Sequence, residues 1–286
     1  MFSGKKVLPF IIIPMSGFLV FFILPFIGGL YYCFFDQLTG KFRAFDGFIS
    51  IVKNEAFQLA MKNTLIVLVT FIPLIIITSV AAAYFICHML SRQRYRKIGS
   101  ALQNAVMLPY LMPSVALAYS FASVFEPGGF VSKALSYAGI ESFNIQHSGY
   151  LIIAAGMIYI WKYSGINIVI IVSALLGIPK EVTDAAKVDG AGGITVLRKI
   201  ILPLIYPELM FVLILSVMNS FKLFREIYII SGSYPPSNMY MLQHFINNNL
   251  LKFDYNKLVC AAYIFLLLIS LPVIVLIRME KKHEYN

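Results

Sequence analysis

Few residues of this sequence have the types and spacing that catalysis requires. Ser164, within Tyr163–Gly165, is the one serine whose setting suggests a nucleophile inside an apolar stretch. A catalytic serine needs a base within hydrogen-bonding reach. The four histidines all fall outside the apolar stretches or at their ends: His88, His147, His244 and His283. An intramembrane protease is therefore the weaker interpretation, and we expect no enzyme activity and no catalytic residue.

The sequence gives no indication of a bound metal or nucleotide either. Cys33, Cys87 and Cys260 lie within or at the edge of apolar stretches, without a CxxC pair or nearby histidine ligands. Cysteines in such places usually act as small core hydrophobes. No GxxxxGK[ST] phosphate loop occurs. We therefore expect no metal site and no cofactor in this chain.

The composition is that of a membrane protein, with 59% hydrophobic and only 13% charged residues. A helix needs about 20 mostly apolar residues to cross a bilayer. The apolar runs are continuous and do not alternate, which favours helices over barrel strands. We predict an all-α protein with one transmembrane domain over residues 1–286, the first stretch being a retained helix and not a cleaved signal. The six expected spans are roughly Val7–Phe35, Thr64–Cys87, Ala105–Phe125, Tyr150–Leu176, Ile201–Phe224 and Leu258–Ile277.

Lysine and arginine collect in segments that six crossings would place on one side of the membrane. The clearest clusters are residues 92–97 and 180–199, and further cations flank both chain ends. Positively charged short loops tend to stay in the cytoplasm. The chain is thus predicted to lie in the cell membrane, as a multi-pass protein with both termini cytoplasmic. A basic membrane face in contact with lipids explains the net charge of +10 with fewer assumptions than a nucleic-acid partner.

The polar run "IPKEVTDAAKVDGAGGITVLRKIILP" separates the fourth and fifth apolar stretches. Pro179 suits a first helical turn, Glu181 and Asp184 complement its positive end, and Gly190 is a natural left-handed stop. The run predicts a short helix over residues 179–189, about 16 Å long and too short to cross a bilayer. Ala185 and Ala186 would give it a face of small side chains.

This run resembles the "EAA" loop of the permease subunits of binding-protein-dependent ATP-binding-cassette (ABC) importers. Asp184, Ala185 and Ala186 stand where that family has Glu-Ala-Ala, and Asp189-Gly190-Ala191 matches its Asp-Gly-Ala at the same spacing. Asp184 departs conservatively from the family's glutamate, and Leu197 stands where an aromatic residue is common. The resemblance implies a coupling helix that docks on a cytoplasmic ATPase. The residues carried over to that role are Glu181, Asp184, Ala185, Ala186, Asp189, Gly190 and Ala191.

The resemblance extends over nearly the whole chain, to the maltose-permease-like group of sugar-importer permeases. "FLVFFILPFIGGLYYCFFD", "NEAFQLAMKNTL", "LPYLMPS" and "SFKLFREIYIISGSYP" match segments of this group in the same order. It implies a type I importer fold of six transmembrane helices, with the coupling helix between helices 4 and 5. A secondary, ion-coupled transporter is the alternative, but such carriers usually show an internal repeat and more than six spans.

The same resemblance implies a set of partners. A second, homologous permease chain would complete the pore, more readily as a heterodimer than as a homodimer. Two cytoplasmic ATPase subunits would hold ATP and Mg²⁺. A lipid-anchored or periplasmic solute-binding protein would deliver a sugar to the outer loops, chiefly residues 126–149 and 231–249.

Polar side chains in mid-helix are costly in a bilayer and are therefore candidates for lining the solute pathway. Tyr110 and Ser114 are four residues apart, as are Tyr159 and Tyr163, and each pair would share a helix face. By the resemblance, seven positions fall where the maltose permease contacts its sugar: Tyr110, Ser114, Tyr159, Tyr163, Asn219, Ser220 and Leu223. Ordinary helix packing explains each of them, taken alone, equally well.

Lys162 lies about twelve residues into the fourth apolar stretch, near mid-depth. An ammonium group there costs roughly 2.5–3.5 kcal/mol on insertion scales, so it should face the bundle interior or water. An internal salt bridge to Glu226 is the favoured interpretation. The alternative is that Lys162, with Lys222 and Arg225, receives an anionic solute such as a sugar acid or a phosphosugar.

Overall fold

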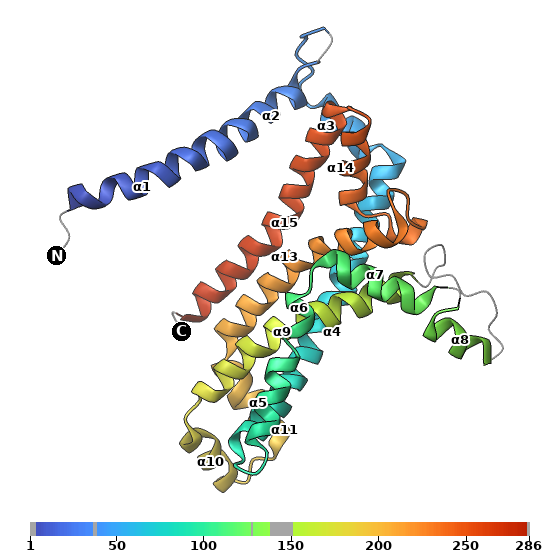
Figure 1. Cartoon of the computed structure of the whole chain (residues 1–286). Coiled ribbons are helices and arrows are strands. Elements are labelled where there is room, and N and C mark those ends of the chain that lie inside the picture. The colour runs from blue at the N-terminus through green and yellow to red at the C-terminus, as the bar shows by residue number, and fades with distance from the viewer. Residues whose placement is uncertain (1–3, 37–38, 127, 138–150, 285–286) are drawn as a thin grey trace. The chain divides into compact units, whose positions relative to one another are not determined.

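The structure is a computed structural model, and it describes residues 4–36, 39–126, 128–137 and 151–284. Regular structure in these residues is helical, apart from one isolated antiparallel bridge between Phe35 and Phe42. Figure 1 labels most of the elements. In chain order they are α1 (Gly4–Phe18), η1 (Leu19–Ile23), α2 (Leu24–Phe34), α3 (Asp46–Val52), α4 (Glu55–Ser91), α5 (Arg96–Ala105), α6 (Leu108–Leu111), α7 (Ser114–Phe125), α8 (Phe130–Tyr137), α9 (Leu151–Gly177), α10 (Lys180–Val188), α11 (Gly193–Val196), η2 (Leu197–Ile201), α12 (Leu202–Leu204), α13 (Tyr206–Ser231), η3 (Ser237–Met239), α14 (Leu242–Leu251) and α15 (Tyr255–Glu284).

Five helical segments are long and apolar enough to cross a membrane: Phe10–Phe34, Glu55–Ser91, Leu151–Gly177, Tyr206–Ser231 and Tyr255–Arg278. A sixth crossing arises only if Arg96–Leu111 and Ser114–Ala134, which meet at a bend of 97°, form one span. The predicted continuous third span over residues 105–125 is therefore interrupted, because Met112 and Pro113 adopt extended backbone angles. Residues 138–150, part of the predicted outer loop and the start of the predicted fourth span, lie outside the described residues.

Two short π-helical turns each end two residues before a proline. η1 precedes Pro25 and η2 precedes Pro203. A proline inside a helix donates no hydrogen bond and clashes with the carbonyl four residues earlier, which here lies within the wider turn. The fifth span begins at Tyr206 and not near the predicted residue 201, because the backbone at Ile205 (φ −98°, ψ 17°) separates the short helix α12 from α13.

The chain divides into two compact units. The larger unit comprises residues 59–244 and 268–286, and its core lies where α9 packs against α7 and α13. Two glycines of α9 permit close approach. A Cβ added to Gly165 would clash with the Val106 carbonyl oxygen, and one added to Gly156 would lie 2.9 Å from the Phe71 ring.

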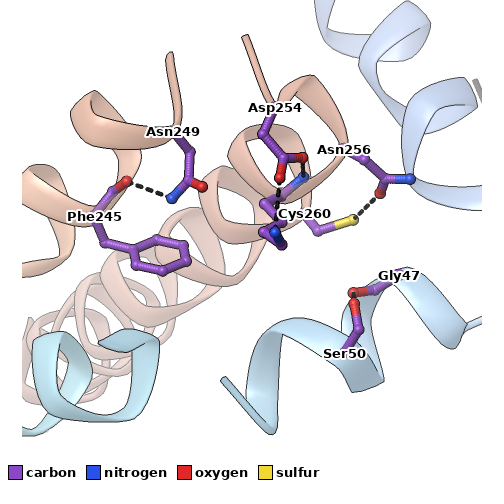
Figure 2. A network of polar contacts seen from close by, with 8 residues as sticks. Gly47, Ser50, Phe245, Asn249, Asp254, Asn256 and Cys260 are labelled. Atoms are coloured by element: carbon purple, nitrogen blue, oxygen red, sulfur yellow. Dashed lines mark hydrogen bonds and ion pairs between the residues drawn. The ribbon is translucent and has the colours of Figure 1, made fainter. Parts of the chain in front are cut away.

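The smaller unit comprises residues 1–58 and 245–267. Figure 2 shows part of its polar network, with Gly47 near Cys260 and Asn256. A Cβ on Gly47 would lie 2.8 Å from the Cys33 carbonyl oxygen and 3.0 Å from the Cys260 sulfur. Cys33 and Cys260 are both buried. The small residue at position 47 thus lets α3 approach α2 and α15.

Asp254 caps the amino end of α15. Its side chain accepts a hydrogen bond from the Lys257 backbone N–H at 3.2 Å and pairs with the Lys257 ammonium at 2.8 Å. Burial alone would raise the pKa of this carboxyl, but the hydrogen bonds and charge of Lys257 hold it below its ordinary value. The cap therefore stays ionised at neutral pH.

Replacing Gly165 by alanine should destabilise the larger unit, because backbone atoms and not a flexible side chain occupy the space of the new methyl group. Overpacking of this kind typically costs about 1–3 kcal/mol. We expect a clearly lower melting temperature of the purified protein. Gly177→Ala is the matched control on the same helix, since nothing lies within 4 Å of its Cβ position. Equal melting temperatures for the two variants would show that α9 and Val106 are not in close contact.

Candidate functional site

The predicted coupling segment contains a helix, α10, over Lys180–Val188. It ends in a Schellman-type turn: Gly190 has a φ of +81°, and the Ala191 N–H bonds to the Ala186 carbonyl at 2.9 Å. This turn explains why a glycine follows the helix, since a side chain at a positive φ is strained. The role of α10 in docking stays a prediction.

The small residues of α10 divide between two directions. Ala186 is buried in a cluster with residues of α4 and α9, including Ala83, Ile86 and Leu175. Ala185 is exposed, and so are Glu181, Asp184, Val188 and Asp189. Ala186 therefore anchors α10 to the membrane-spanning bundle, while Ala185 and the neighbouring acids face away from it.

Lys162 forms a buried ion pair with Glu226. The Lys162 ammonium lies 2.6 Å from Glu226 Oε1 and also donates a hydrogen bond to Ser114 Oγ at 2.7 Å. The two charged residues are 5% and 0% exposed. The contact joins α9 to α13 and α7, and it neutralises the mid-span cation within the chain. Glu226 Oε2 is buried and has no hydrogen-bond partner among the described residues.

A cluster of tyrosine rings lies beside Lys162. The Lys162 ammonium lies 5.4 Å from the centre of the Tyr163 ring, which also contacts the rings of Tyr110 (6.3 Å) and Tyr159 (5.5 Å). The prediction that Tyr110 and Ser114 share one helix face is wrong, because the helix breaks between them. Both nevertheless reach α9, one through Tyr163 and the other through Lys162.

The other predicted pathway residues bond mainly to their own or neighbouring helices. The Tyr159 hydroxyl donates to the Ser216 carbonyl at 2.7 Å, and the Ser220 hydroxyl donates to the Val217 carbonyl. Asn219 accepts a hydrogen bond from the Lys222 ammonium at 2.8 Å. Leu223 is fully buried in the same cluster as Tyr159 and Tyr163, whereas Lys222 and Arg225 are exposed. Solute contact by these residues stays a prediction.

Sequence reasoning missed a second buried polar contact between the same helices. The Asn167 side chain is fully buried and donates to Ser216 Oγ at 2.9 Å. Asn167 lies five residues after Lys162 on α9, and Ser216 lies ten residues before Glu226 on α13. Polar residues in mid-span on both helices were the available signal. No group of three or more potential metal ligands occurs in the described parts of the chain.

Comparison with known proteins shows that this chain is similar in sequence to permease proteins of bacterial transport systems. The arabinooligosaccharides transport system permease protein AraP of Bacillus subtilis is 26% identical over 84% of this chain and 77% of its own length. The sn-glycerol-3-phosphate transport system permease protein UgpA of Yersinia pestis is 28% identical over 64% of this chain and 61% of its own length.

The fold matches that of a solved transporter. One chain of a bacterial ABC transporter involved in the import of the acidic polysaccharide alginate superposes with a TM-score of 0.81 at 20% identity, over 97% of this chain and 96% of that one. The fold is thus that of a type I ABC importer permease. The family described as "Binding-protein-dependent transport system inner membrane component" matches residues 85–281, more than half of the sequence. The chain therefore belongs to this family of multi-pass membrane permeases.

Proposed function

We propose that this chain forms half of the translocation pathway of an ABC importer for an uncharged carbohydrate. The observation that carries the proposal is the Lys162–Glu226 ion pair, which neutralises the buried cation of the predicted pathway. What remains beside it is a group of tyrosine rings and the Ser114 hydroxyl. Aromatic faces suit the C–H faces of sugar rings, and hydroxyl groups suit their edges. The naming of AraP for arabinooligosaccharides supports a carbohydrate.

An anionic solute is the second candidate. Lys222 and Arg225 are exposed on α13, close in sequence to the predicted pathway residue Asn219. UgpA and the alginate transporter are named for anionic cargo, which supports this alternative. It requires these two cations, and not Lys162, to meet the solute, since Lys162 is already paired.

The proposed importer complex contains further subunits. A second permease of similar fold completes the pore, two ATPase subunits bind ATP and Mg²⁺ in the cytoplasm, and an external binding protein delivers the solute. Both termini of this chain lie in the cytoplasm. The exposed face of α10 contacts one ATPase, and Ala186 passes its movement to α4 and α9. ATP drives transport only because its binding favours one of two global arrangements.

Solute-stimulated ATP hydrolysis by the reconstituted complex tests the proposed solute class. Neutral oligosaccharides, delivered by the cognate binding protein, should stimulate hydrolysis, whereas sugar acids and glycerol phosphates of similar size should not. Stimulation by the anionic compounds alone would favour the second candidate.

Glu226→Gln should disable transport of the neutral solute, because it leaves the Lys162 ammonium buried without its counter-charge. Breaking a buried pair from one side typically costs about 3–5 kcal/mol. We expect a lower melting temperature and loss of neutral-sugar uptake in vesicles.

The double variant Lys162→Met with Glu226→Gln is the control, since it removes both charges and should recover most of the lost stability. Recovery of neutral-sugar uptake as well would show that neutrality, and not the pair itself, is what the pathway requires. Wild-type stability of the Glu226→Gln single variant would contradict the buried pairing.

Ala185→Leu should weaken association with the ATPase, because a larger side chain keeps the docking surface away from α10. A tenfold loss of affinity corresponds to about 1.4 kcal/mol, and we expect a loss of at least about this size in co-purification with the ATPase. Ala81→Leu changes another exposed alanine, on α4, and is the control that should co-purify normally. Full association and uptake by Ala185→Leu would rule out docking through this face.

A further inference from the structure

A cavity of about 210 Å³ lies beside the amino end of α10, where α4 and α9 end. Neither the predicted coupling residues nor the predicted pathway residues line it. The lining comes from α4, from the end of α9, from the amino end of α10 and from η2: Tyr84, Cys87, His88, Ser91, Leu175, Leu176, Ile178, Lys180, Thr183 and Ile201. The cavity is therefore a feature separate from the proposed transport site.

The lining favours an anion. It contains the Lys180 ammonium, the His88 imidazole and the Tyr84 hydroxyl, but no carboxylate. None of these three groups has a hydrogen-bond or ion-pair partner within the described parts of the chain. By contrast, the Ser91 and Thr183 hydroxyls donate to the carbonyls of Cys87 and Lys180. The cavity thus offers unused hydrogen-bond donors, among them the Lys180 ammonium.

Its position indicates an amphiphilic ligand. The cavity lies at the ends of two membrane-spanning helices, so it is placed near the boundary between lipid and water. Leu175 and Ile201 form buried apolar parts of its lining. Leu176 on α9 and Phe85 on α4 are 52% and 55% exposed and provide apolar surface alongside. Basic pockets between membrane helices at this level commonly hold the head groups of anionic lipids.

We propose that this cavity binds the phosphate group of an anionic phospholipid, held by Lys180, His88 and Tyr84. The acyl chains then lie along the exposed apolar side chains at the ends of α4 and α9. Because Lys180 begins the helix that we assign to ATPase docking, a bound lipid would also restrain the junction between α9 and α10. A free phosphate ion offers the same chemistry to these donors, and the experiment separates the two sources.

Native mass spectrometry of the complete, detergent-purified complex tests the proposal directly. Phosphatidylglycerol is titrated against the wild type and against Lys180→Gln with His88→Gln, and phosphatidylcholine serves as the lipid without net charge. Each juxtamembrane cation contributes about 1 kcal/mol to binding of an anionic lipid, so the affinity for phosphatidylglycerol should fall about fivefold or more in the double variant, with a matching fall in occupancy at low lipid concentration. Lys97→Gln removes an exposed cation of α5 outside the cavity and should leave the occupancy unchanged.

A second arm measures the melting temperature of each complex with inorganic phosphate. If the double variant retains phosphatidylglycerol like the wild type, but phosphate stabilises only the wild type, the anion site holds free phosphate. The proposal is overturned if neither probe distinguishes the variant, or if phosphatidylcholine binds as well as phosphatidylglycerol. Neither arm depends on uptake. A negative result would therefore overturn lipid binding without affecting the proposed transport function, and a failure of the transport proposal would leave lipid binding untouched.

Discussion

A charge buried inside a membrane-spanning bundle, where water does not reach it, needs a counter-charge and hydrogen-bonding groups from the protein itself. Lys162 and Glu226 meet this requirement across α9 and α13, and Ser114 adds a contact from α7. Tyr159 and Asn167 bind Ser216 across the same pair of helices. Because these contacts tie three helices together, they restrict how the helices can slide past one another. The glycines at 156 and 165 let α9 pack closely on its other sides, against Phe71 of α4 and against the backbone at Val106.

Helix α9 connects the proposed pathway to the proposed docking surface. α9 carries Lys162 and Tyr163 in its middle and ends at Gly177, and α10 begins three residues later at Lys180. Ala186 is buried in the same apolar cluster as residues of α4 and α9, and under the proposed function this cluster is where a displacement of α10 would reach the bundle. The glycine-rich turn at 190–193 is where α10 separates from the segment that leads into α13.

Several features were predictable from sequence because their cause is local. Apolar length predicted the helical, membrane-spanning character, and mid-span polarity singled out Lys162 with Glu226 as its favoured partner. The break at Met112 and Pro113 was missed because the apolar pattern runs through it. Pro113 was the available signal, since a proline disfavours helical backbone at the residue before it, and Met112 is indeed extended. The Asn167–Ser216 contact depends on the rotation of α9 against α13, and the lone sequence does not fix that rotation. The division of Ala185 and Ala186 between two directions likewise follows from how α10 packs on the bundle.

An experimental structure of the complete complex with its solute bound is the most direct measurement of the central claim. The proposal predicts solute density against the rings of Tyr110 and Tyr163, with the Lys162 ammonium still paired to Glu226. It would be contradicted by a Lys162 ammonium that has left Glu226 and contacts a carboxylate or phosphate of the solute.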